Sequence, residues 1–157
     1  MIRIASVALS LLVLFADQLT KGWVENYFSG MPGQQRFTSF FNLVLTRNSG
    51  VSFGLLQSGS PWGVLLLSAL VVAIIAALQI WMWRTSSALV ALGIGLICGG
   101  ALGNLMDRLR LGAVRDFLDF HWGELNYWAF NLADSAVFVG VMLLLTENLL
   151  TRPKQHN

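Results

Sequence analysis

Two aspartates in the C-terminal third of the sequence are the residues best suited to chemistry. Asp134 and Asn131 stand at the head of a long apolar run, Ala136 to Leu145, and Asp116 lies shortly before it. Burying an unpaired charge among apolar groups costs several kcal/mol, so an acid at such a position indicates a functional site with a nearby partner. We expect Asp116 to be that partner.

Two carboxylates held together at a partly desolvated site share one proton over a broad pH range. This arrangement suits peptide hydrolysis, because the ionised acid can take a proton from water while the protonated acid hydrogen-bonds the carbonyl oxygen. His121 and His156 are the only histidines, so no Ser–His or Cys–His nucleophile competes. Asp116, Asp119, His121 and Asp134 could instead bind a metal, but their spacing matches no recognised ligand motif. We expect no cofactor.

The composition is that of an integral membrane protein. Of 157 residues, 55% are hydrophobic and only 11% are charged, whereas soluble domains are about 25% charged. The net charge of +2 comes from few residues without a clustered basic face, so we expect no nucleic-acid partner. Cys98 is the single cysteine, which excludes a disulfide within the chain.

Hydropathy predicts one all-α membrane domain, residues 1–157, with a small β element. A helix needs about 20 apolar residues to cross the bilayer, and four stretches meet this requirement, at about 4–24, 62–83, 86–106 and 128–150. The first is interpreted as an uncleaved helix, because Leu14-Phe15-Ala16 does not fit a signal-peptide cleavage site. Loops 26–60 and 108–127 lie outside the membrane.

The first loop contains the predicted β element. Residues 37–46 and 51–56 are rich in aromatic and β-branched side chains, and Asn48-Ser49-Gly50 between them is typical of a turn. These features predict a β-hairpin at the membrane surface. Asn48 is either a turn former or an amide that orients a group at the site, and local sequence does not decide between the two.

Helix spacing brings further polar residues together. Asp17 and Lys21 are four residues apart, so they share one helix face; they either form an ion pair at the lipid boundary, with Lys21 extended toward water, or belong to the site. Gly95, Gly99 and Gly103 also recur every four residues, with Asp107 at the next step. Such a stripe allows close helix packing, either within the chain or in a dimer.

Four spans place both termini on one side of the membrane and seven of the eight acids on the other. This segregation favours a reaction or binding centre at one interface over a simple anchor. The site-bearing face carries six Lys and Arg residues and the opposite face four, so the positive-inside rule alone would place the site in the cytoplasm. The polar residues that meet at the site face are Asp17, Lys21, Asn48, Asn104, Asp107, Arg108, Asp116, Asn131 and Asp134.

Two other classes of protein remain as alternatives. Paired acids in a membrane also serve as proton relays in transporters, but a transport path requires polar residues across the bilayer, and residues 62–83 carry no charge. The second alternative is a non-enzymatic scaffold, in which the glycine stripe would be a dimer interface.

Five blocks of residues, in order across nearly the whole chain, resemble the lipoprotein signal peptidase family, signal peptidase II, the membrane aspartyl proteases of bacteria. Each block alone is weak, but five in order across four apolar spans are specific. The blocks are Asp17-Gln18 with Lys21; Asn48 with Gly50 and Phe53; Gly99-Gly100 through Gly103-Asn104 to Asp107-Arg108; Val114 with Asp116-Phe117; and Phe130-Asn131 with Ala133-Asp134-Ser135.

The resemblance implies a catalytic dyad of Asp116 and Asp134. It also implies a substrate, a prolipoprotein whose cysteine bears diacylglycerol, cut just before that cysteine to release the signal peptide. Arg115 occupies a position that varies in such proteins. Residues implied to support the site or bind substrate are Asp17, Lys21, Asn48, Gly50, Asn104, Asp107, Arg108, Asn131 and Ala133.

The resemblance also implies the setting of the enzyme. It places the chain in the bacterial cytoplasmic membrane in contact with lipid, with four transmembrane helices, a small β-cradle and the active site at the outer face, and both termini in the cytoplasm. This orientation is opposite to the one given by the charge count. We expect the protein to work as a monomer.

Overall fold

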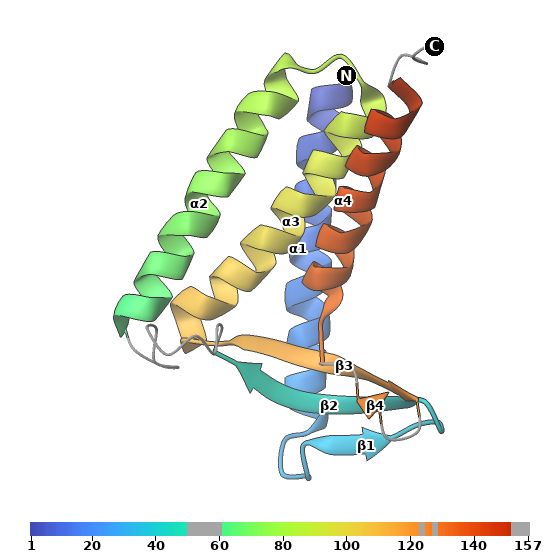
Figure 1. Ribbon diagram of the computed structural model, residues 1–157. Helices are drawn as coiled ribbons and strands as arrows, with labels where there is room; N and C mark the ends of the chain where they lie inside the picture. Colours follow the sequence, from blue (N-terminus) through green and yellow to red (C-terminus); the bar gives the residue numbers. More distant parts are fainter. Residues whose placement is uncertain (50–60, 123–124, 127–128, 152–157) are drawn as a thin grey trace.

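The computed structural model describes residues 1–49, 61–122, 125–126 and 129–151, which form a helical bundle with a small sheet at one end (Figure 1). Among these residues, four helices are long and apolar enough to cross a membrane: α1 (Ile2–Tyr27), α2 (Pro61–Arg84), α3 (Ala88–Leu111) and α4 (Leu132–Thr151). The N-terminus and the end of α4 lie together, opposite the sheet. The predicted fold class is confirmed.

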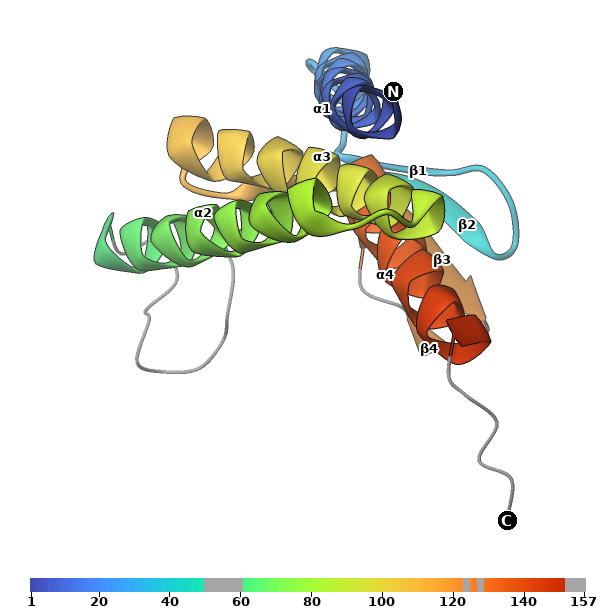
Figure 2. The ribbon, with the colours of Figure 1, turned by 90° about the horizontal axis from the view of Figure 1, so that it is seen from above.

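The central helix of the bundle is α3, which contacts each of the other three (Figure 2). Toward α2, the buried side chains of Met82, Ile94 and Cys98 form one apolar cluster. Because most side chains of α2 and α4 that face away from α3 are apolar and exposed, the bundle presents a hydrocarbon surface suited to lipid.

The glycine stripe of α3 packs inside the chain against α1. A side chain at Gly95 would meet the carbonyl oxygen of Ser6 at 2.8 Å, and one at Gly99 would meet that of Ser10 at 2.7 Å. The close approach lets Ser6 Oγ donate to the carbonyl of Ala91 (2.6 Å) and Ser10 Oγ to that of Gly95 (2.8 Å). Of the two alternatives for this stripe, the structure therefore shows internal packing.

The sheet joins two loops that are distant in sequence. Its order is β1 (Gln34–Arg36), β2 (Phe41–Asn48), β3 (Val114–Trp122) and β4 (Leu125–Asn126), with neighbouring strands antiparallel. At the end of α1, Val24 and Phe28 pack on Leu43 of β2 and Phe117 of β3. This apolar cluster fixes the sheet beneath the helices and so places β3 beside the polar ends of α1 and α3.

The strand predicted in the first loop forms, and it pairs with two strands that the sequence analysis did not predict. β2 pairs with β1 on one edge and with β3 on the other, so the second loop supplies a strand that sequence reasoning missed. Residues 51–56, the predicted second strand of the hairpin, and Gly50 lie outside the described residues. Non-local pairing of this kind depends on tertiary packing rather than on turn residues.

Helix ends differ from the predicted spans chiefly at α3, which continues to Leu111 instead of ending at 106. Charge led to the earlier boundary, yet Asp107 is fully buried within the protein, and a buried acid that has partners does not end a helix. Gly112 ends it instead, in the left-handed region at φ 73° with its N–H bonded to the carbonyl of Arg108. The extra turn carries Asp107 and Arg108 to the sheet.

Candidate active site

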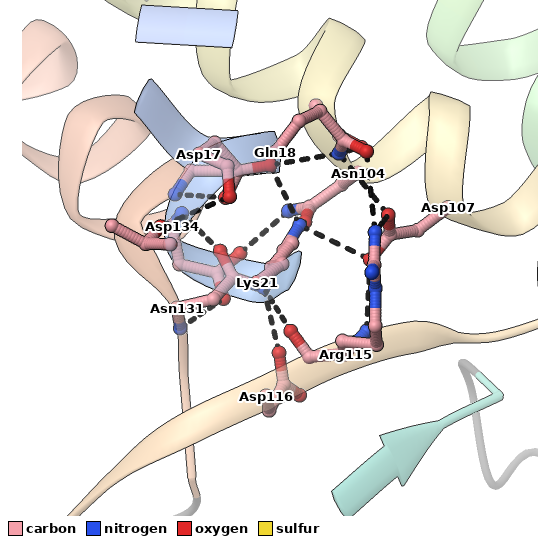
Figure 3. A network of polar contacts seen from close by, with 12 residues as sticks. Asp17, Gln18, Lys21, Asn104, Asp107, Arg115, Asp116, Asn131 and Asp134 are labelled. Atoms are coloured by element: carbon pink, nitrogen blue, oxygen red, sulfur yellow. Dashed lines mark hydrogen bonds and ion pairs between the residues drawn. The ribbon is translucent and has the colours of Figure 1, made fainter. Parts of the chain in front are cut away.

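The two predicted acids come from different elements and both accept hydrogen bonds from Asn131 (Figure 3). Asp116 lies on β3 and Asp134 in the first turn of α4. Asn131 Nδ2 donates to Asp116 Oδ1 at 2.7 Å, while the backbone N–H of Asn131 donates to Asp134 Oδ2 at 3.1 Å. A single buried asparagine therefore fixes the position of one carboxylate relative to the other.

The same asparagine caps α4. Its Oδ1 accepts from the backbone N–H of Asp134 at 3.0 Å, while the Asp134 carboxylate accepts from the N–H of Asn131. This reciprocal pair is a capping box, which satisfies two of the N–H groups that a helix start leaves free. The backbone N–H of Ala133 is satisfied by Asp17 Oδ1 at 3.1 Å. The sequence signal was available, because asparagine and aspartate stand three residues apart before an apolar run.

Two further side-chain amides donate hydrogen bonds to the acids. Asn48 Nδ2 donates to Asp116 Oδ2 at 3.1 Å, so Asn48, at the end of β2, contacts a candidate catalytic acid. Asn104 Nδ2 donates to Asp134 Oδ1 at 2.8 Å, and its Oδ1 accepts from Lys21 Nζ at 3.0 Å. Within the described residues, the acids accept these bonds from amides and no salt bridge reaches either of them.

Burial raises the pKa of Asp116 above its ordinary value, and the nearby charge of Asp134 raises it further. The hydrogen bonds from Asn48 and Asn131 and the charge of Lys21 oppose this effect without cancelling it. Asp116 is 2% exposed, so water solvates its ionised form poorly. The site therefore disfavours the ionised form of Asp116 relative to that of an exposed aspartate.

A second cluster of acids, adjacent to the first, is bound to cations. Lys21 Nζ lies 2.8 Å from Asp17 Oδ2 and 3.3 Å from Asp107 Oδ2, and all three side chains are 0% exposed. The predicted pair of Asp17 and Lys21 is present, but Lys21 does not extend to water as one alternative had it. It is enclosed because the glycine stripe brings α1 close to α3, where Asp107 and Asn104 face it.

Arg115 belongs to this second cluster, together with Gln18 and Glu25, and none of the three was among the predicted site residues. The Arg115 guanidinium binds the Asp107 carboxylate at 2.7 and 3.2 Å, and hydrogen bonds to Asp107 raise the pKa of Arg115 further. A signal for Glu25 was present, because Asp17, Lys21 and Glu25 recur every four residues on one face of α1.

Arg108 lies on the last turn of α3, half-buried, near the charges of Asp134 and Asp116. Its Nε is buried and has no hydrogen-bond partner in the part of the chain that the structure describes. A buried donor without a partner is rare in folded proteins. This nitrogen is therefore available to a ligand that brings an oxygen atom to the acids.

The four side chains considered as an alternative metal site do not converge in the structure. Asp119 Oδ2 accepts from Asn42 Nδ2 at 2.8 Å, and His121 Nδ1 lies 3.4 Å from the same nitrogen. Within the described residues, no three His, Cys, Asp or Glu side chains converge as metal ligands would. His121 and Asn42 line a polar pocket on the sheet, and Asp119 bonds Asn42, apart from the contacts of Asp116.

The fold and the site define a membrane protein that holds two amide-bonded carboxylates at one end of a four-helix bundle. The family model described as "Signal peptidase (SPase) II" matches residues 9–150. Because this match spans most of the sequence, the chain belongs to the signal peptidase II family, and it is a membrane peptidase of the aspartyl class. The predicted family and enzyme class are confirmed.

Individual relatives agree with this assignment. The "Lipoprotein signal peptidase" of Nitrobacter hamburgensis is 42% identical, over 95% of this chain and 94% of its own, and that of Shewanella oneidensis is 38% identical, over 93% and 86%. A bacterial membrane enzyme solved in meso at 1.9 Å resolution superposes with a TM-score of 0.79 at 26% identity, over 94% of both chains. A second, solved at 2.3 Å, gives 0.74 at 27% identity, over 98% of this chain and 94% of that one.

Proposed function

We propose that Asp116 and Asp134 are the catalytic dyad of a peptidase that cleaves a diacylglyceryl-modified prolipoprotein just before the lipidated cysteine. The observation that carries this proposal is that Asn131 holds both carboxylates, Asp116 through its side-chain amide at 2.7 Å and Asp134 through its backbone N–H at 3.1 Å. The substrate class is supported by the relatives, which carry the name lipoprotein signal peptidase.

The geometry assigns different roles to the two acids. Asp116, whose pKa burial raises, holds the shared proton and donates it in a hydrogen bond to the carbonyl oxygen of the scissile peptide. Asp134, which accepts from Asn104 and from the N–H of Asn131, takes a proton from the attacking water. When the tetrahedral intermediate collapses, Asp134 returns that proton to the amine nitrogen of the cysteine, and the signal peptide leaves with a new carboxyl group.

Other predicted residues support the dyad or meet the substrate. Asn48 and Asn131 orient Asp116, and Asn104 orients Asp134. Asp17, Lys21, Asp107 and Ala133 hold α1, α3 and α4 in register around these amides. Arg108 binds a carbonyl oxygen of the substrate, because its buried Nε faces the site without a partner among the described residues.

The substrate approaches from the membrane. Beside Asp134, α4 has a groove of about 350 Å³ lined by Phe130, Ser135, Phe138 and Val139, which suits an apolar segment. We place the sheet and the dyad at the outer face of the bacterial cytoplasmic membrane and both termini in the cytoplasm. Cysteine substitutions at exposed Phe37 and Arg84 test this orientation: an impermeant thiol reagent labels position 37 only if the sheet lies outside.

We propose that the active enzyme is a monomer in the lipid bilayer. The glycine stripe that could have served a dimer is occupied by α1 within the chain. Residues from α1, α3, β3 and α4 of one chain build the cluster around both acids. Light scattering of the purified enzyme beside its activity tests this: a monomer that cleaves supports the proposal, and activity confined to a larger species contradicts it.

The dyad is tested with a gel-shift assay of purified enzyme on a diacylglyceryl-modified prolipoprotein. Asp116→Asn and Asp134→Asn should each lower kcat by about 10³-fold or more, because each removes one partner in proton transfer. Asp119→Asn is the matched control, since Asp119 lies on the same strand but contacts Asn42; its rate should match wild type. If either dyad variant folds and cleaves at the wild-type rate, the mechanism is wrong.

A further inference from the structure

Arg115 bonds residues of two helices, which is more than the neutralisation of a single acid would require. Its guanidinium bonds Asp107 of α3 at 2.7 and 3.2 Å, Glu25 of α1 at 3.0 Å and Gln18 of α1 at 3.2 Å. The side chain is 10% exposed. A planar guanidinium can satisfy several acceptors at fixed angles at once, and here it connects two helices to strand β3.

The backbone of the same residue is also held on both sides. The N–H of Arg115 donates to Asp107 Oδ2 at 3.0 Å, and its carbonyl accepts from Asn131 Nδ2 at 3.2 Å. That nitrogen also donates to Asp116, the next residue along the strand. The peptide unit that enters Arg115 is therefore held through its N–H by Asp107 of α3, and the next unit, which leads into Asp116, is held through its carbonyl by Asn131 at the start of α4.

We propose that Arg115 is a positioning residue, which clamps β3 to α1 and α3 so that the Asp116 carboxylate is held at the reaction distance. The proposal rests on the role of Asp116 in the proposed function. Arg115 does not touch the substrate; it acts through its own backbone and through Asp107. A small displacement of a reacting group can lower the rate by about 10²-fold, so fixing this one peptide has a large kinetic effect.

Glu25 and Arg47 show which contacts matter. Arg47 lies directly opposite Arg115 across the pair of β2 and β3, and Glu25 bonds both arginines, at 3.6 Å to Arg47 and 3.0 Å to Arg115. Arg47, however, is 61% exposed, and Glu25 is the acid with which it pairs among the described residues. Arg47 thus matches Arg115 in residue type, location and one partner, but not in the clamp on Asp107.

The test measures kcat and KM separately for Arg115→Lys, Arg115→Gln and the control Arg47→Gln. Lysine keeps the charge but cannot bind Asp107 in two places and Glu25 together. We expect Arg115→Lys to lower kcat by about 10-fold and Arg115→Gln by about 100-fold, with KM within about twofold of wild type, since ground-state binding is not altered. Arg47→Gln should keep the wild-type kcat.

Other results would overturn the positioning role. If charge alone matters, Arg115→Lys keeps the wild-type kcat; if the residue only stabilises the fold, the variants melt earlier in detergent but their folded fraction turns over normally. A rise in KM at constant kcat would instead indicate substrate binding. Asp116→Asn in the same series separates the two proposals: if it stays active, the dyad fails, whereas an inactive Asp116→Asn beside fully active Arg115 variants removes the clamp alone.

Discussion

Two groups of buried carboxylates lie side by side at the sheet end of the bundle, and they differ in their partners. Asp17 and Asp107 bind the ammonium of Lys21, and Asp107 also binds Arg115. Asp116 and Asp134 accept hydrogen bonds from the amides of asparagines. We call these groups the cation-bound acids and the amide-bound acids.

Burial alone does not separate the two groups, because Asp116 is as enclosed as the cation-bound acids, although Asp134 is only partly buried. Asp17 and Asp107 are 0% exposed, and Asp116 is 2% exposed. The partner type does separate them. A direct cation stabilises the charged form of an acid, whereas an amide donor leaves protonation to the balance of burial and neighbouring charge. The comparison teaches that, among the described residues, the two acids proposed to exchange a proton are those bonded by amides and by no lysine or arginine.

The largest effect is expected from breaking the cation-bound acids. Lys21→Met leaves Asp17 without its cation in a fully buried setting, and removing one partner of a buried ion pair costs about 3–5 kcal/mol. Unfolding in detergent, followed by circular dichroism, measures the loss. Arg84→Met, at the opposite end of the bundle and exposed, should cost less than about 0.5 kcal/mol. Equal stability of the two variants would contradict the buried network.

The next effect concerns the amide-bound acids. Asn131→Ala removes the side-chain donor to Asp116 and the side-chain acceptor that caps α4, while its backbone N–H can still donate to Asp134. We expect kcat to fall by about 10²-fold to 10³-fold, as for other preorganised donors, and stability to fall by about 1–2 kcal/mol. Asn42→Ala is the control, because that amide bonds Asp119 elsewhere on the sheet. A normal kcat for Asn131→Ala would show that catalysis does not depend on the side-chain bonds of Asn131.

The smallest effect is a shift in pH dependence. The amide of Asn48 favours the ionised form of Asp116 and so lowers the pKa of that acid, although burial keeps it above the ordinary value. Asn48→Ala should therefore raise this pKa further. Since the proposed mechanism requires a proton on Asp116, the alkaline limb of kcat/KM should move to higher pH, by less than about one unit because amide bonds are modest. A limb that stays in place or moves to lower pH would contradict a protonated Asp116.

Much of the fold and the meeting of the polar residues could be predicted from the sequence. Four apolar stretches gave the helices, and the common end of four spans placed Asp17, Asn104, Asp116 and Asp134 together. What could not be predicted depends on contacts between distant segments. The strand over residues 114–122 forms because β2 and the end of α1 offer it hydrogen bonds and an apolar face, and no local pattern encodes either partner.

The buried state of Lys21 and the clamp of Arg115 also escaped sequence reasoning. Spacing identified the pair of Asp17 and Lys21, but whether lysine reaches water depends on how closely α3 approaches, which the glycines determine only in three dimensions. Arg115 stands next to an acid in the sequence, yet its side chain points to residues 8, 90 and 97 positions away. Neighbouring residues in the sequence thus indicate the chemistry of the site, whereas contacts between distant residues fix the positions of its side chains.

The bond from the N–H of Ala133 to Asp17 has a consequence for biosynthesis. It joins residues 116 positions apart, near the two ends of the chain. A ribosome-bound chain that has inserted its first three helices holds Asp17 and Lys21 but lacks Asn131, Ala133 and Asp134. With Asp134 in the proposed dyad, the enzyme gains its activity only when the last helix enters the membrane, and a partly synthesised chain does not cleave the proteins being translocated beside it.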